Sequence, residues 1–331
     1  MTGTLGAVIV DLNPLGWAQL ARVQKQDDVF EKVLQHVLLY INAFLGLRYD
    51  NHLLVIAACP NQSHLLYPAE PQAAAEAASK PKPVNVYEEF HTANEQVASQ
   101  LRAVFRQQQA QFRAAGGGDD DDAAATAARR AATSPTATAA EDAAHVAAHL
   151  GVAKTSATAA TSAMASALSK ALAYTNKVKV ARPDMEIATR SLIISLTPDN
   201  PAEYVPLMNC IFAAQKMGHM LEVCKLHRGD TAFLEQAAHI TGSNFIQVDD
   251  VSRLAQTLLQ VFLPDQETRR WLVLPTKEDV DFRAACFCHK RIVSVGFVCS
   301  ICLSIFCAPQ KECIMCGTEY DISSLPASLE S

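Results

Sequence analysis

The C-terminal cysteines constrain this chain more tightly than any other feature of its sequence. Seven of the ten cysteines fall in the last forty-six residues: Cys286, Cys288, Cys299, Cys302, Cys307, Cys313 and Cys316. Two Cys-x-x-Cys pairs stand ten residues apart, and each tight turn directs both of its sulfurs to one side. Four thiolates can then meet at one point, which suits tetrahedral Zn²⁺. The spacing predicts a small zinc-binding module. Disulfides are not expected, because nothing near Met1 resembles a signal peptide.

Length and composition predict two folded units that stay in a reducing compartment. The chain has 331 residues, half of them hydrophobic, which is enough for one sizeable core and a small satellite. The three other cysteines, Cys59, Cys210 and Cys224, lie in apolar runs, where thiols are usually buried. No stretch has the length of a membrane span. The net charge of -6 argues against a chain whose main task is to bind a nucleic-acid backbone.

The N-terminal third alternates between patterns typical of buried strands and of a helix. Residues 5–10 are apolar throughout and end on Asp11, which indicates a strand buried on both faces. Apolar residues then recur at helical spacing over 29–45, with Asp27 or Asp28 as the expected N-cap. Residues 53–58 predict a second buried strand, and 64–67 a hairpin partner that ends at Pro68. The pattern favours a parallel sheet.

The same alternation returns after a long interruption. We expect strands at 192–196, 221–226 and 244–248, and helices at 162–180, 204–217, 231–241 and 252–262. Short connections rich in turn and cap residues join them. The predicted fold class is α/β, with a parallel-cored, Rossmann-like sheet, helices on both faces, and ligands or partners at the carboxyl ends of the strands.

The interruption covers about residues 107–161 and has almost no large apolar side chain. It contains three consecutive glycines at 116–118, four aspartates at 119–122 and a tract dominated by Ala and Thr. Such a segment cannot bury enough surface to offset its ordering entropy, so we expect disorder or transient helix. A tolerated surface insertion is the preferred interpretation, and a regulatory tract is the alternative.

The apolar first strand ending in Asp, followed by this alternation, resembles a von Willebrand factor A domain. That family binds Mg²⁺ through a D-x-S-x-S sequence, with a second Asp from another loop. Here the sequence is Asp11-Leu12-Asn13-Pro14-Leu15, and Leu15 offers no oxygen to a hard cation. We therefore expect no Mg²⁺. Asp11 should instead cap backbone amides at the turn into the next helix, with Asp199 facing the same crevice.

The tail narrows the resemblance to one family. Residues 281–289 (DFRAACFCH), leading into 298–307 (VCSICLSIFC), and the Leu-Tyr-Pro turn at 66–68 are similar to a family of subunits of the general transcription and DNA repair factor IIH. The resemblance implies a non-catalytic nuclear scaffold with a C4 zinc finger, whose ligands fall on Cys299, Cys302, Cys313 and Cys316. We expect one Zn²⁺ per chain. The implied partners are the other core subunits, especially the RING-bearing subunit that also carries a von Willebrand A domain. DNA would be contacted only indirectly, and no membrane or small-molecule substrate is expected.

The expected domain organisation follows from these patterns. A von Willebrand A-like domain covers 1–265 with the insertion at about 107–161, a linker covers 266–285, the zinc finger 286–320 and a tail 321–331.

Several alternatives stay open at this point. A second zinc site could use Cys288, His289 and Cys307. A RING-like ubiquitin ligase would need eight ligands for its cross-brace, and an integrin-like Mg²⁺-dependent binder would need a metal at Asp11. No nucleotide-binding or hydrolase motif occurs, so the chain is not expected to be an enzyme. Isolated acidic and histidine residues are interpreted as helix or loop surface: Glu186, Glu222, His219, His227 and His239.

Overall fold

The computed structural model describes ten segments: residues 3–60, 62–68, 88–114, 163–183, 187–199, 203–226, 231–265, 267–273, 286 and 295–320. Before the insertion these form β1 (Thr4–Asp11), α1 (Pro14–Gln24), α2 (Val29–Leu47), β2 (His52–Cys59), β3 (Gln62–Tyr67) and α4 (Glu88–Ala114). After it come α8 (Met164–Ala181), β4 (Ala188–Ser195), α9 (Tyr204–Lys216), β5 (Met220–Leu226), α10 (Ala232–Ile240), β6 (Phe245–Val248) and α11 (Leu254–Thr257). The hairpin β7 (Phe297–Val298) and β8 (Ile305–Phe306) follows near the C-terminus.

The central sheet has the strand order β3-β2-β1-β4-β5-β6. All neighbours in it are parallel except β2 and β3, which form the predicted hairpin. From β1 the sheet extends in one direction through β2 and β3 and in the other through β4, β5 and β6. The carboxyl ends of the parallel strands β1 and β4 therefore lie side by side at one edge of the sheet. Ligand sites of open α/β sheets form at such a position.

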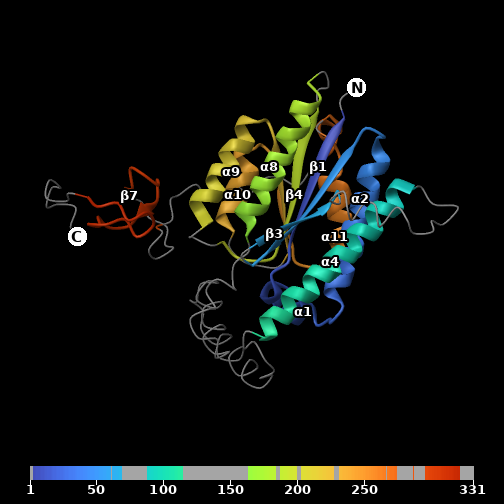
Figure 1. Cartoon of the computed structure of the whole chain (residues 1–331), viewed down its shortest axis with the longest axis horizontal. Coiled ribbons are helices and arrows are strands. Elements are labelled where there is room, and N and C mark those ends of the chain that lie inside the picture. Colours follow the sequence, from blue (N-terminus) through green and yellow to red (C-terminus); the bar gives the residue numbers. More distant parts are fainter. Residues whose placement is uncertain are drawn as a thin grey trace.

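Two apolar layers cover the two faces of the sheet. On one face Val8, Val10, Val55 and Ile194 pack against α1, α2, α4 and α11. On the other face Ile9, Ile56, Ile193 and Val223 pack against α8, α9 and α10 (Figure 1). Adjacent strand residues point to opposite faces, so a strand that is apolar at every position is buried on both sides. The predicted α/β architecture is therefore confirmed.

Helix α1 lies in a stretch for which no helix was expected. Asn13 is its N-cap, because the Asn13 side chain accepts a hydrogen bond from the Leu15 amide, and Pro14 occupies the first turn. Gly16 inside the helix obscured the pattern. A Cβ there would lie 3.1 Å from the Leu196 Cβ, so close packing favours glycine at this position. Pro14 therefore begins a helix directly after Asn13.

Helix α4 is the second element that sequence reasoning missed. Its Phe105 ring stacks on Phe30 with centroids 4.1 Å apart, and Trp17 packs against both rings. Arg102 also forms an ion pair with Glu31 of α2. The predicted insertion began at about 107, but the helix continues to Ala114 and buries Gln108. The rest of the predicted insertion, from 115 onward to 161, lies outside the described residues.

Smaller departures concern helix ends and the last helix. Asp28 is the N-cap residue of α2, but its side chain makes no capping hydrogen bond. The single helix predicted at 252–262 is instead a 3₁₀ turn (Val251–Arg253), α11 and a π-helical turn (Leu258–Phe262).

Within the described residues, no helix is both long and apolar enough to cross a membrane.

The interpretation of Glu222 and His219 as surface residues was wrong. Glu222 on β5 is fully buried and pairs with Arg269, while Arg190 lies 4.0 Å away. His219 is buried just before β5 and its ring contacts the Ser191 hydroxyl at 2.7 Å. Burial lowers the pKa of His219 to about 4, so the ring is neutral near pH 7. In these two cases, a single polar residue beside or within an apolar stretch of sequence is a buried side chain with a polar partner. Glu186 and His227 lie outside the described residues.

Candidate metal centre and sheet-edge crevice

Two tight turns position the four predicted zinc ligands. In the first, the Leu303 amide donates to the Cys299 carbonyl and the Cys299 amide donates to the Ser304 carbonyl. In the second, the Gly317 amide donates to the Cys313 carbonyl and the Cys313 amide to the Thr318 carbonyl. Each turn closes on a residue with positive φ, Leu303 at 61° and Gly317 at 69°. The repeated geometry follows from the repeated Cys-x-x-Cys spacing.

The four sulfurs converge on one point. Their Sγ atoms all lie within 4.8 Å of one another, and the pairs Cys299–Cys316 and Cys302–Cys313 are each 3.6 Å apart. Zinc–sulfur bonds of about 2.3 Å in a tetrahedron require sulfur separations of about 3.8 Å. The donor set and its spacing therefore fit one Zn²⁺ ion. Bound there, the metal would hold the two turns together.

Three hydroxyl groups surround this sulfur cluster, each on a different cysteine. Tyr320 donates to the Cys299 sulfur, Ser304 lies 3.1 Å from the Cys302 sulfur, and Thr318 lies 3.0 Å from the Cys316 sulfur. Burial raises the pKa of Cys299, but hydrogen bonds from the Cys302 backbone and from Tyr320 outweigh it and lower the pKa to about 6. Donors of this kind favour the thiolate form that a metal requires. Sequence reasoning singled out the four cysteines but not these hydroxyls.

The remaining C-terminal cysteines are placed only in part. Cys286 is buried, and Cys307 is half-buried outside the four-sulfur cluster. Cys288 and His289, which the possible second site would need, lie outside the described residues. The second site therefore stays a hypothesis.

A second polar cluster occupies the carboxyl edge of the sheet, where β1 and β4 end. Asp11 is fully buried, and one carboxylate oxygen accepts hydrogen bonds from the Leu196 amide, the Thr197 amide and the Thr197 hydroxyl at 3.1, 2.9 and 2.7 Å. The other oxygen accepts from the Asn13 amide at 3.1 Å. The expected capping of the turn into the next helix is thus present. Most of the bonds, however, come from the loop after β4, which sequence reasoning did not anticipate.

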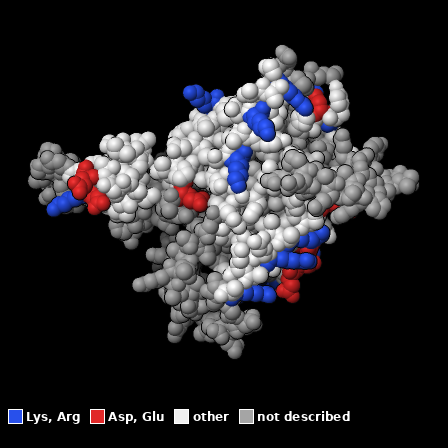
Figure 2. All heavy atoms as spheres, viewed as in Figure 1, with Lys and Arg blue, Asp and Glu red and all other residues white. Residues whose placement is uncertain are grey.

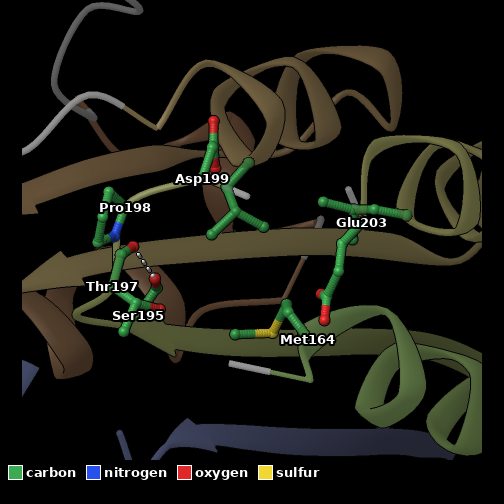
Figure 3. A pocket seen from close by; sticks show the side chains of 8 residues that line it. Met164, Ser195, Thr197, Pro198, Asp199 and Glu203 are labelled. Atoms are coloured by element: carbon green, nitrogen blue, oxygen red, sulfur yellow. Dashed lines mark hydrogen bonds between the residues drawn. The ribbon is translucent and has the colours of Figure 1, made fainter. Parts of the chain in front are cut away.

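Other charged groups of the crevice are also engaged. Asp199 accepts a hydrogen bond from the Phe233 amide at the start of α10, at 2.7 Å. Glu203 lies across the pocket from Asp199 and extends toward Met164 at the start of α8 (Figure 3). Burial raises the pKa of Glu203, and amides of Ala165 and Met164 oppose that shift. Lys225 of β5 is buried and its ammonium group donates to the Thr197 carbonyl. These carboxylates therefore hold helix starts and loop amides.

Charge on the visible surface is dispersed. On the face in Figure 2, some Lys and Arg side chains lie apart on uncharged surface, and a short row of them along the lower right edge has acidic groups beside it. A protein that tracks a nucleic-acid backbone concentrates basic residues along one stripe. Lys277 and Arg283, two basic residues that precede the zinc module in the sequence, lie outside the described residues.

Together, the fold and site define a class: an α/β domain with a six-stranded, mainly parallel sheet and a buried carboxylate at its carboxyl edge, followed by a four-cysteine module. The profile of the family described as Transcription factor Tfb4 matches residues 4–118 and 118–317. The chain belongs to this family.

Individual relatives agree with the family match. The chain is 32% identical over 331 residues to "General transcription and DNA repair factor IIH subunit tfb4" of Schizosaccharomyces pombe, covering 100% of this chain and 93% of the relative. It is 43% identical over 155 residues to "General transcription factor IIH subunit 3" of Dictyostelium discoideum, covering 47% of this chain and 41% of that one. The solved "TFIIH p34 N-terminal Domain" matches with a TM-score of 0.53 and 26% identity, covering 78% of this chain and 97% of that one.

Proposed function

We propose that this chain is a non-catalytic structural subunit of the general transcription and DNA repair factor IIH, acting in the nucleus in transcription initiation by RNA polymerase II and in nucleotide excision repair. The single observation that carries the proposal is the family match over nearly the whole chain, together with relatives named as subunits of that factor. The fold supports a scaffold: the polar groups of the crevice cap amides instead of facing a substrate. Its partners would be other core subunits, foremost the RING-bearing subunit with its own von Willebrand A domain.

The zinc ligands in this proposal are Cys299, Cys302, Cys313 and Cys316. Four converging thiols at the spacing of a zinc tetrahedron support one ion per chain. A RING cross-brace would require a second four-ligand cluster, and the described part of the chain contains the one cluster. A Mg²⁺-dependent ligand binder is not favoured, because backbone amides and a hydroxyl already occupy the Asp11 carboxylate.

Affinity purification of the tagged full chain from nuclear extract tests the assembly. We expect the helicase subunits and the RING-bearing subunit to co-purify in stoichiometric amounts. Recovery of the chain without them, under salt conditions that keep the factor intact, would contradict the proposed function.

Zinc content is tested separately on the purified chain. Elemental analysis should give one zinc per chain, and Cys313→Ser should lose it. Cys210→Ser is the matched control, because Cys210 lies on α9 away from the four-sulfur cluster. Zinc retained by the Cys313 variant, or lost by the control, would contradict the assigned ligands.

A further inference from the structure

Lys225 is a buried lysine at the sheet edge where von Willebrand A domains with an intact site bind Mg²⁺. It lies on β5 beside Ser195 of β4, and 1% of its surface is exposed. A lysine is almost never this buried unless its charge has a partner. The burial of the Lys225 ammonium group therefore requires partners that stabilise its charge.

The ammonium group is linked to Asp11 through one residue. Lys225 donates to the Thr197 carbonyl, and the amide and hydroxyl of the same Thr197 donate to the Asp11 carboxylate. Thr197 thus lies between a buried cation and a buried anion. The Ser195 hydroxyl also donates to the Thr197 carbonyl at 3.4 Å (Figure 3). The loop after β4 is held in place from both sides.

The electrostatics of Lys225 point in the same direction. Burial lowers the pKa of Lys225 to about 8, while Asp11 and Asp199 act to raise it. The group is an ammonium ion near pH 7, and two carboxylates offset part of its desolvation cost. The Asp11 side chain, in turn, receives its hydrogen bonds from uncharged backbone amides and from the Thr197 hydroxyl.

We propose that the Lys225 ammonium group is the resident cation of this crevice and takes the electrostatic place of a divalent metal ion, so that the domain folds without metal. A divalent ion bound at Asp11 would be repelled by the Lys225 charge on the other side of Thr197 and would have to displace the donors that already bind the carboxylate. The side chain that excludes the metal also supplies the positive charge that the acidic residues require. The carboxyl edge is then a fixed loop anchor.

A double-mutant cycle on the full chain tests this role. Lys225→Met keeps most of the stem and removes the charge, and Asp199→Asn removes one carboxylate while keeping an oxygen for the Phe233 amide. If the ammonium interacts with this carboxylate, Lys225→Met should lower the melting midpoint more in the chain that keeps Asp199 than in the Asp199→Asn background. We expect a coupling of about 2–5 °C. Lys216→Met, on the exposed end of α9, is the control and should show no coupling.

Two further measurements keep the proposal testable if Lys225→Met fails to fold. The side-chain amine of isotope-labelled Lys225 should titrate at lower pH in Asp199→Asn than in the wild type, because a favourable negative charge is lost. In metal-depleted buffer with the zinc site loaded, millimolar Mg²⁺ or Mn²⁺ should leave the wild-type midpoint unchanged. Equal effects of Lys225→Met in both backgrounds, an unshifted titration, or a midpoint raised by Mg²⁺ would each overturn the proposal.

Discussion

At the scale of single residues, the sheet edge shows how one loop orders a buried charge cluster. Asp11 satisfies four donors from two separate segments, and Lys225 reaches the same loop from β5. Sequence reasoning expected Asp11 to cap the turn into a helix, and that bond is present. The donors at Leu196 and Thr197 come from 185 and 186 residues away, so only folding brings them to Asp11.

The buried lysine predicts a specific pH dependence of stability. The pKa of Lys225 is about 8 in the folded chain, below the ordinary lysine value of 10.5. Between these pH values the unfolded chain binds the additional proton, so the free energy of unfolding contributed by this group rises with pH, by up to about 3 kcal/mol. Below pH 8 both states are protonated and the contribution is constant.

Urea unfolding of the wild type and Lys225→Met across this range isolates that contribution. Buried thiols such as Cys59 and Cys224 have raised pKa values and titrate in both proteins, so they cancel in the difference. The free energy of unfolding of the wild type, minus that of the variant, should increase from pH 8 to 10.5. A difference that stays flat or shrinks would show that Lys225 is not charged and buried as described.

The hydroxyls around the cysteine cluster give a second residue-scale prediction. Tyr320→Phe removes the donor to the Cys299 sulfur and should weaken zinc binding by about 10-fold, a typical effect of losing a hydrogen bond to a metal ligand. Competition with a chromophoric chelator measures the affinity. Tyr49→Phe is the control, because Tyr49 is 94% exposed and distant in sequence. Equal zinc affinity of both variants and the wild type would show that the Tyr320 contact is only packing.

At the scale of elements, the aromatic cluster of Trp17, Phe30 and Phe105 joins three helices that come from separate stretches of sequence. Helix α4 carries few strongly apolar residues, and its long polar face conceals the apolar stripe. The helix is held in place because Phe105 packs against aromatic residues of α1 and α2. Packing of an amphipathic face, more than propensity, stabilises such helices.

Phe105→Ala should therefore destabilise the large domain by about 3–4 kcal/mol, because it leaves a cavity between three helices. Chemical denaturation gives the free energy of unfolding. Gln107→Ala on the exposed side of the same helix should change it by less than about 0.5 kcal/mol. If the two substitutions cost the same, α4 would not be packed on α1 and α2 in solution.

At the scale of the whole molecule, a buried ion cluster ties the segment after the last helix back to the sheet. Arg190 of β4 donates to the carbonyls of Phe262, Leu263 and Pro264, and Arg269 pairs with Glu222 of β5. Burial raises the pKa of Glu222, while both arginines lower it. The predicted linker begins at 266, yet Arg269 still contacts the sheet.

Arg269→Met should cost about 3 kcal/mol in the free energy of unfolding, because it leaves the buried Glu222 carboxylate with only the more distant Arg190. The neighbouring Arg270→Met is a matched control, since Arg270 is exposed. Thermal and denaturant unfolding of the full chain should separate the two variants. Equal stabilities would mean that the ion pair is not maintained in solution.

What the sequence by itself determined follows from local periodicity and spacing. Apolar runs predicted the strands of the parallel sheet, and three- and four-residue spacing predicted α2 and α8 to α10. The Cys-x-x-Cys pairs marked the residues that the structure brings together. These signals are local, so they survive without knowledge of the fold. Tertiary structure decided the rest: that Gly16 could lie within a helix, that α4 had a site to fill, and that Glu222, His219 and Lys225 are buried. Buried polar side chains are tolerated there because partners distant in sequence hydrogen-bond to them, and Gly16 is favoured because Leu196 packs closely against it. These neighbours meet only when the chain folds.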